Sequence, residues 1–140
     1  MSMLILSSQE LGIITKSYIE LSHRSENVFE KFYSNFFLID PSAKNLFTNV
    51  DLKKQRQMLF ESISYFISSD EITDQDIDEY VETLKNIHQS VHIALSQYDS
   101  FKKAFIKTFR EAYGSSFTVQ IEQIWSKLLD EILKRFSKKD

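Results

Sequence analysis

The sequence predicts an all-α protein, and three observations lead to this prediction. Gly12, Gly114 and Pro41 are the only glycine and proline residues among 140, too few for the turns of a strand-rich fold. Apolar residues recur every three or four positions, which is the period of amphipathic helices. Twelve phenylalanines supply a large aromatic core. We therefore expect about seven helices in a single domain, residues 1–140.

Composition and charge exclude several classes of protein. The formal net charge of −3 gives no basic footprint for nucleic acid or an anionic membrane. The absence of cysteine excludes disulfides, iron–sulfur clusters and covalently attached haem. The N-terminal run MSMLIL is too short for a signal peptide, and no later stretch is long enough to span a membrane. We expect a cytoplasmic protein that binds neither nucleic acid nor membrane.

The first expected helices follow from capping residues and apolar spacing. Ser7 and Glu10 have the spacing of a capping box, which opens a helix with an apolar face as far as Leu21. A charged break at residues 23–26 precedes a second helix, whose inward residues would be Phe29, Phe32, Tyr33, Phe36 and Phe37.

Two acidic residues mark the next helix starts. Asp40 followed by Pro41 should open a short helix that reaches Phe47. Asp51 can cap a longer helix after it. The expected inward face of that helix is Leu52, Gln55, Leu59, Ser62, Ile63 and Phe66.

The second half of the chain predicts three longer helices after a polar loop at 68–73. Thr73 or Asp74 would cap the first, which we expect to end near His92. A short connection to Tyr98 then leads into a helix that ends at Gly114. The last helix follows a Thr118 cap and has inward residues Ile121, Trp125, Leu128, Ile132 and Phe136.

Three polar residues, Tyr33, Gln55 and His88, occupy positions where the helical pattern calls for apolar ones. Each has a structural explanation on its own, because a tyrosine or histidine in a core often bonds a carbonyl and a glutamine often lies at the edge of an apolar face. For His88 a metal ion is the alternative partner. Spacing alone leaves these interpretations open.

With these residues in place, the chain resembles the bacterial single-domain globins and the globin part of flavohaemoglobins from about Phe29 to Phe136. The resemblance rests on FYSNFFLIDPSAKNLF, on DLKKQRQMLFESI, on LKNIHQ with a tyrosine ten residues after the histidine, and on the segment from Thr118 to Trp125. It implies a globin fold, in which helices form a three-on-three sandwich around a haem pocket. The implied cofactor is haem b, iron protoporphyrin IX.

The resemblance also implies a role for individual residues. It places His88 below the haem as the iron ligand, and Tyr33 and Gln55 above the iron in the distal pocket. The other residues expected to contact haem are Phe47, Leu59, Ile93 and Tyr98.

The chemistry of these residue types agrees with that assignment. Haem is a flat apolar disc with a charged edge, so it needs an apolar slot, one nitrogen ligand and open space above the iron. A tyrosine hydroxyl and a glutamine amide aimed at dioxygen would each stabilise the bound gas by roughly 1–3 kcal/mol and slow its release. Such a pocket suits reaction of the gas better than release on demand.

The resemblance therefore implies dioxygen and nitric oxide as ligands, and nitric oxide dioxygenase as a candidate activity. Flavohaemoglobins oxidise nitric oxide to nitrate with electrons from an attached flavin and NADH module. These 140 residues contain no such module, so we expect turnover to need a separate reductase.

Several alternatives stay open at this level. His92 lies one helical turn after His88, so it could replace His88 as the iron ligand. The two histidines also form an HxxxH pair of the kind that binds zinc, but Gln89 stands where the HExxH motif has glutamate. Two further hypotheses are a gas or redox sensor that acts through a partner protein, and a globin-fold module that binds no haem. Lys85 and His92 also replace glycines common in the family, and nothing in the sequence indicates the oligomeric state.

Overall fold

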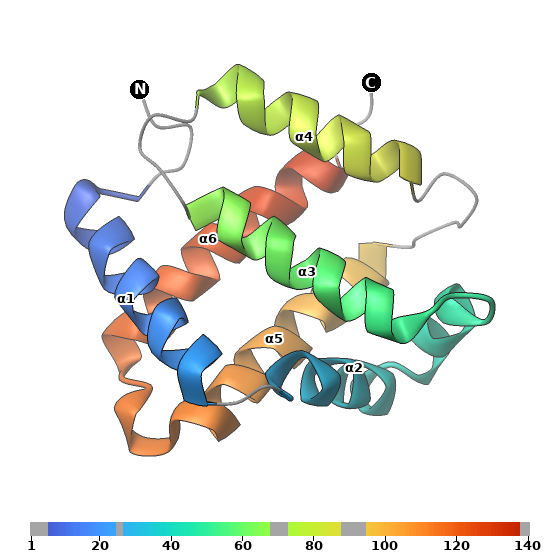
Figure 1. The fold of residues 1–140 in the computed structure, drawn as a ribbon, viewed down its shortest axis with the longest axis horizontal. Helices are drawn as coiled ribbons and strands as arrows, with labels where there is room; N and C mark the ends of the chain where they lie inside the picture. The colour runs from blue at the N-terminus through green and yellow to red at the C-terminus, as the bar shows by residue number, and fades with distance from the viewer. Residues whose placement is uncertain (1–5, 25–26, 68–72, 88–94, 138–140) are drawn as a thin grey trace.

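The computed structural model describes residues 6–24, 27–67, 73–87 and 95–137 (Figure 1). The predicted all-α class is confirmed: within these ranges there is no strand, and none of the helices is long and apolar enough to cross a membrane. In chain order the elements are α1 (Ser8–Arg24), α2 (Val28–Ile39), the 3-10 helix η1 (Pro41–Phe47), α3 (Leu52–Ile67), α4 (Asp74–Ile87), α5 (Leu95–Tyr113), the 3-10 turn η2 (Gly114–Ser116) and α6 (Val119–Ser137).

Two of these helices begin with a reciprocal cap. Before α1, the Ser7 amide donates to Glu10 Oε1 at 3.0 Å and the Glu10 amide donates to Ser7 Oγ at 3.1 Å, so the predicted capping box is confirmed. Before α4, the Thr73 amide donates to Asp76 Oδ2 at 3.1 Å and the Asp76 amide donates to Thr73 Oγ1 at 3.0 Å. These bonds satisfy amides that have no partner within the helix, and so place both helix starts.

The other predicted boundaries are also set by short-range chemistry. Asp51 Oδ1 accepts from the Lys53 amide at 3.0 Å at the start of α3, and Thr118 Oγ1 accepts from the Ile121 amide at 3.2 Å at the start of α6. Gly114, with φ +58°, follows the last residue of α5 and takes the left-handed conformation that ends many helices.

One expected boundary is wrong and another changes in character. We expected a connection as far as Tyr98, but α5 begins at Leu95. No glycine or proline interrupts this stretch, and Ser100 Oγ donates to the Ser96 carbonyl at 3.0 Å, a bond between residues one helical turn apart. The short helix after Asp40 is of the 3-10 type. The end of α4 expected near His92 lies outside the described residues.

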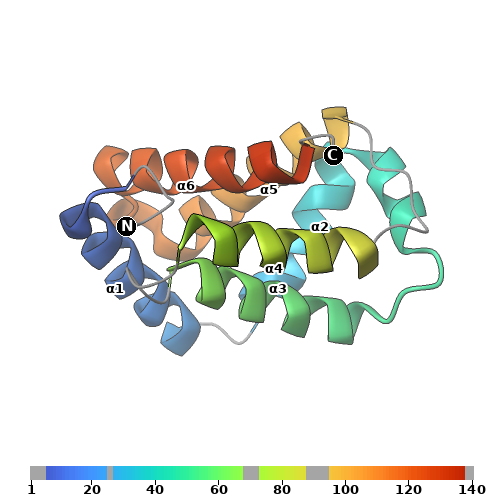
Figure 2. The same ribbon diagram turned by 90° about the horizontal axis from the view of Figure 1, so that it is seen from above.

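The helices form two layers around the core. In Figure 1, α3 runs diagonally across the front of the molecule while α5 and α6 lie behind it, and in Figure 2 α1 and α3 lie on the opposite side from α5 and α6. The most extensive contact joins α2 to α5, and α4 packs on α6. The arrangement agrees with the expected sandwich, because α1 and α3 face α5 and α6 while α4 and α2 pack on that second pair.

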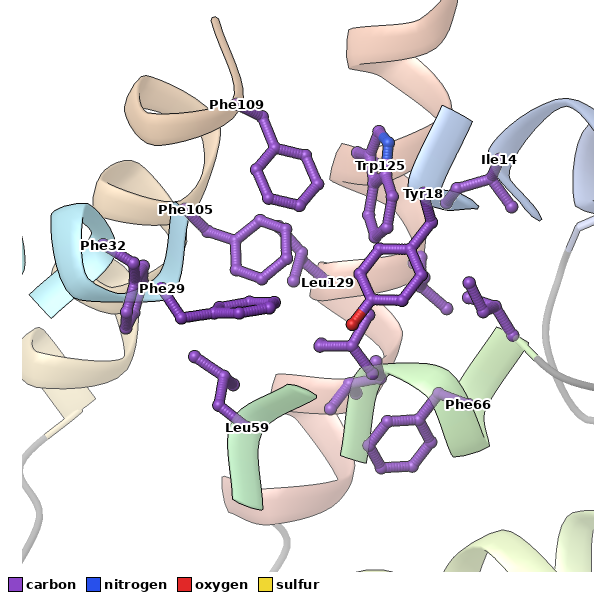
Figure 3. Packing of buried hydrophobic residues seen from close by; sticks show 14 of the residues in the cluster. Ile14, Tyr18, Phe29, Phe32, Leu59, Phe66, Phe105, Phe109, Trp125 and Leu129 are labelled. Carbon is purple, nitrogen blue, oxygen red and sulfur yellow. The ribbon is translucent and has the colours of Figure 1, made fainter. Parts of the chain in front are cut away.

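Aromatic residues from several helices build the centre of the core (Figure 3). The Trp125 side chain is fully buried, with its ring centroid 4.8 Å from that of Phe109 and 5.5 Å from that of Phe105. Tyr18 of α1 packs on Trp125 and donates to the Phe60 carbonyl of α3 at 3.1 Å. Burial raises the pKa of Tyr18 to about 12, so this hydroxyl keeps its proton and its bond at neutral pH.

Arg135 of α6 forms ion pairs with the first turns of α4. Its guanidinium lies 2.5 Å from Asp78 Oδ1 and 3.7 Å from Asp74 Oδ1 of α4, and 3.3 Å from Glu131 Oε1 on its own helix. The Arg135 side chain is only 15% exposed, so water screens these charges less than at an open surface. Three carboxylates thus converge on one guanidinium.

We expect Arg135→Gln to lower the free energy of unfolding by about 1–2 kcal/mol, because it removes charge-assisted bonds that are partly shielded from water. Lys103→Gln is the matched control. Lys103 pairs with Asp99 at 3.0 Å, but both side chains are more than 60% exposed, so its loss should cost less than about 0.5 kcal/mol. Urea unfolding of both variants measures the difference. Equal losses would mean that the Arg135 contacts do not hold α4.

Candidate functional site

A cavity of about 520 Å³ lies among α2, η1, α3, α4, α5 and α6, within the range of about 300–1,000 Å³ usual for ligand pockets. Aromatic side chains form much of its wall: Tyr33, Phe36, Phe47, Phe66, Tyr98, Phe101 and Phe136. Aliphatic side chains and one methionine form most of the remainder: Leu46, Val50, Met58, Leu59, Ile63, Leu84, Leu129, Ile132 and Leu133.

Every predicted site residue that the structure describes lines this one cavity, namely Tyr33, Phe47, Gln55, Leu59 and Tyr98. The remaining predicted site residues, His88 and Ile93, lie outside the described residues, as does His92. The part of the chain that is described contains no group of three or more histidine and acidic side chains able to hold a metal ion. The zinc alternative, which depends on the HxxxH pair, therefore stays a prediction.

One face of α3 forms a continuous side of the cavity. Gln55, Leu59, Ser62 and Phe66 follow one another at three or four residues, and all of them line the cavity as well as the expected inward face. Leu59 and Phe66 also belong to the hydrophobic core, so the cavity is an extension of that core (Figure 3). The Asp51 cap starts α3 ahead of these residues, so they lie in regular helix and share one face.

Phe47, the last residue of η1, is held against α2 by neighbouring rings. Its centroid lies 5.5 Å from Tyr33 with the rings edge to face, 5.5 Å from Phe37 and 6.4 Å from Phe36. These distances are typical of favourable aromatic pairs. The ring of Phe47 is therefore fixed beside Tyr33 at the cavity wall.

Tyr33 and Gln55 meet in the cavity from different helices. Tyr33 is 5% exposed, and burial raises the pKa of its hydroxyl well above the usual value near 10. A side-chain hydrogen bond with Gln55 and the charge of Arg56 lower this pKa by smaller amounts. The hydroxyl therefore stays protonated at neutral pH, and two neutral donors, O–H and amide N–H, share one region of the cavity.

A second group of polar side chains lines the cavity from the end of α4 and the start of α5: Lys85, Gln97 and Tyr98. Gln97 is 9% exposed, and its Nε2 donates to Ser42 Oγ of η1 at 3.3 Å. Ser42 Oγ in turn donates to Asp40 Oδ1 at 2.5 Å. Burial raises the pKa of the Tyr98 hydroxyl. This chain of bonds ties the start of α5 to η1.

Sequence reasoning did not identify Lys85 or Gln97 as cavity residues. The position of Lys85 could have been found, because it lies four residues after the buried Val81 and so near the apolar face of the same helix. Gln97 was missed because the sequence analysis placed it in the connection before α5, where no helical face could be assigned to it. Both positions depend on how α4 and α5 are turned against the rest of the fold.

The wall of the cavity fits the haem that the resemblance implies. Broad aromatic and aliphatic surfaces from α2, η1, α3 and α6 suit a flat apolar disc, and neutral polar groups at Tyr33 and Gln55 leave room for a small polar ligand. A cationic group at Lys85 suits the charged edge of that disc.

The family comparison covers the same part of the chain. A model of the globin family matches residues 30–136, a range that begins before Tyr33 and includes every residue that lines the cavity. No curated protein matches the chain. Globins bind haem and, through it, dioxygen or another diatomic gas. Since the family model covers most of the sequence and all the residues that line the cavity, the chain belongs to the globin family.

Proposed function

We propose that this globin uses haem b to convert nitric oxide to nitrate, as its resemblance to bacterial single-domain globins and flavohaemoglobins implies. Nitric oxide, dioxygen and one electron give one nitrate ion, and a separate reductase would supply the electron. The observation that carries the proposal is the pair of donors, Tyr33 and Gln55, in one otherwise apolar cavity.

Haem, when bound, supplies an iron that takes up a diatomic gas. The hydroxyl of Tyr33 can donate a hydrogen bond to such a ligand, because burial keeps its proton in place. The Gln55 amide lines the same cavity and offers a second donor. Donors fixed in advance in a dry site stabilise developing charge more than mobile water does, so the pair should retain dioxygen until nitric oxide arrives.

The apolar wall has two roles in this proposal. It excludes water from the bound gas, which strengthens the hydrogen bonds from Tyr33 and Gln55. It also accepts nitric oxide, a small molecule of low polarity, more readily than it accepts ions. Phe47 and Leu59 would then press on the haem face, His88 would ligate the iron, and Tyr98 and Ile93 would lie on the side of His88.

The test is to mix the oxygenated protein with an equal amount of nitric oxide and to measure nitrate. We expect about one nitrate per haem, formed as the spectrum changes from the oxygenated to the ferric form. The same protein saturated with carbon monoxide in the absence of dioxygen is the control and should yield none. An oxygenated sample that forms no nitrate would contradict the dioxygenase and leave gas sensing through a partner, or storage, as the function.

A further inference from the structure

The cavity has one charged residue among the described residues that line it, Lys85 of α4. The other lining side chains are apolar, aromatic or neutral and polar. A cation at the wall of an apolar pocket is best placed at the edge, where water or an anion can reach it. Its placement is therefore informative about the ligand.

Lys85 lies where the cavity meets solvent. Its side chain is 24% exposed, while the neighbouring Leu84 is buried. Lysine commonly packs its hydrocarbon stem along an apolar surface and keeps the ammonium at the edge. Its Nζ is 3.9 Å from Glu82 Oε2, a long contact for an ion pair, and the Glu82 carboxylate is half exposed. The charge of Lys85 thus lies at the cavity edge, within reach of a carboxylate on a ligand that fills the cavity.

We propose that Lys85 binds a carboxylate on the edge of haem and thereby fixes which edge faces the end of α4. This inference rests on haem binding in the cavity, since the disc is apolar except for its two carboxylates. Gln97 and Tyr98 line the cavity too, but both are neutral, and Gln97 Nε2 already donates to Ser42. Lys85 is thus the described lining residue with the charge that a carboxylate needs.

The competing reading is that Lys85 contributes only its hydrocarbon stem to the wall. Lys85→Met keeps most of that stem and removes the charge, whereas Lys85→Arg keeps the charge. Iron protoporphyrin IX dimethyl ester provides the matching change in the ligand, because its two carboxylates are esterified and carry no charge. Comparing both variants with both ligands separates charge from packing.

The experiment measures the rate at which haem leaves each ferric protein for an excess of an apoglobin acceptor. With natural haem we expect Lys85→Met to release it about three- to tenfold faster than the wild type, and Lys85→Arg within about twofold. With the dimethyl ester, wild type and Lys85→Met should release at equal rates. Higher salt should shrink the difference seen with natural haem.

Lys103→Met, at an exposed lysine of α5 outside the cavity, controls for the change in total charge and should match the wild type. Equal release of natural haem by wild type and Lys85→Met would overturn the proposal. So would a Lys85→Met effect that persists with the dimethyl ester, because it would show a packing role. Either result leaves nitrate formation untouched, whereas a wild-type protein that takes up no haem would overturn both proposals.

Discussion

Replacing His88 with alanine is expected to weaken haem binding by more than about 100-fold, the largest effect we predict for any single substitution. Loss of an outer-shell partner of a metal ligand already costs about 10–100-fold in affinity, and loss of the ligand itself should cost more. Titration of haem into the apoprotein, followed by the Soret absorption band, measures the change. Imidazole added in solution should restore much of the band, because it fits the space that the side chain leaves.

His92→Ala is the matched control, one helical turn further along the sequence. We expect it to keep the affinity and the five-coordinate ferrous spectrum of the wild type. The reverse pattern, with His88→Ala unchanged and His92→Ala impaired, would move the iron ligand to His92. A wild-type sample with no Soret band after addition of haem would contradict haem binding altogether.

The second large effect is expected at the other side of the cavity. Tyr33→Phe should raise the rate of dioxygen dissociation by about 10–100-fold, because it removes a hydrogen bond to a partly charged ligand. Such a bond contributes about 1.5–3 kcal/mol. Stopped-flow replacement of dioxygen by carbon monoxide measures this rate. The Tyr33 pKa is raised by burial, so the hydroxyl stays protonated and the difference between the two proteins should be constant from pH 6 to about pH 9.

Tyr65→Phe makes the same chemical change outside the cavity lining, on the same helix as Gln55, and should leave the dissociation rate unchanged. The Gln55→Leu variant and the double variant with Tyr33→Phe complete a cycle. Because both side chains line one cavity and would donate to the same small ligand, the double variant should lose less than the sum of the single losses. A wild-type rate in Tyr33→Phe would mean that this hydroxyl does not reach the gas.

Most helix starts could be predicted because the groups that make them lie within a few residues of each other. The bonds between Ser7 and Glu10, between Thr73 and Asp76, and from the Lys53 amide to Asp51 join residues two or three positions apart. Spacing along the sequence is sufficient for such chemistry. The inward face of α3 followed from the same local rule, since residues three or four positions apart lie on one face of a helix with 3.6 residues per turn.

The start of α5 could not be predicted in this way. Gln97 is buried against Ser42, 55 residues earlier in the chain, so the first turn of α5 is held by a contact that local sequence does not contain. The sequence places Lys85 near the apolar face of α4, but its place in the cavity also depends on how α4 packs on α6. Arg135, near the other end of the chain, contributes to that packing through its ion pairs with α4.

By itself the sequence determined that the protein is all-α, where most of its helices begin, and, through the resemblance, that Tyr33, Phe47, Gln55, Leu59 and Tyr98 belong to one site. Only the tertiary structure decided that these side chains line a single cavity and that Lys85 and Gln97 join them. The physical reason is the separation along the sequence of the residues that interact. Caps and helical faces are made by neighbours in sequence, whereas a cavity is the space between helices whose mutual orientation depends on contacts between distant residues.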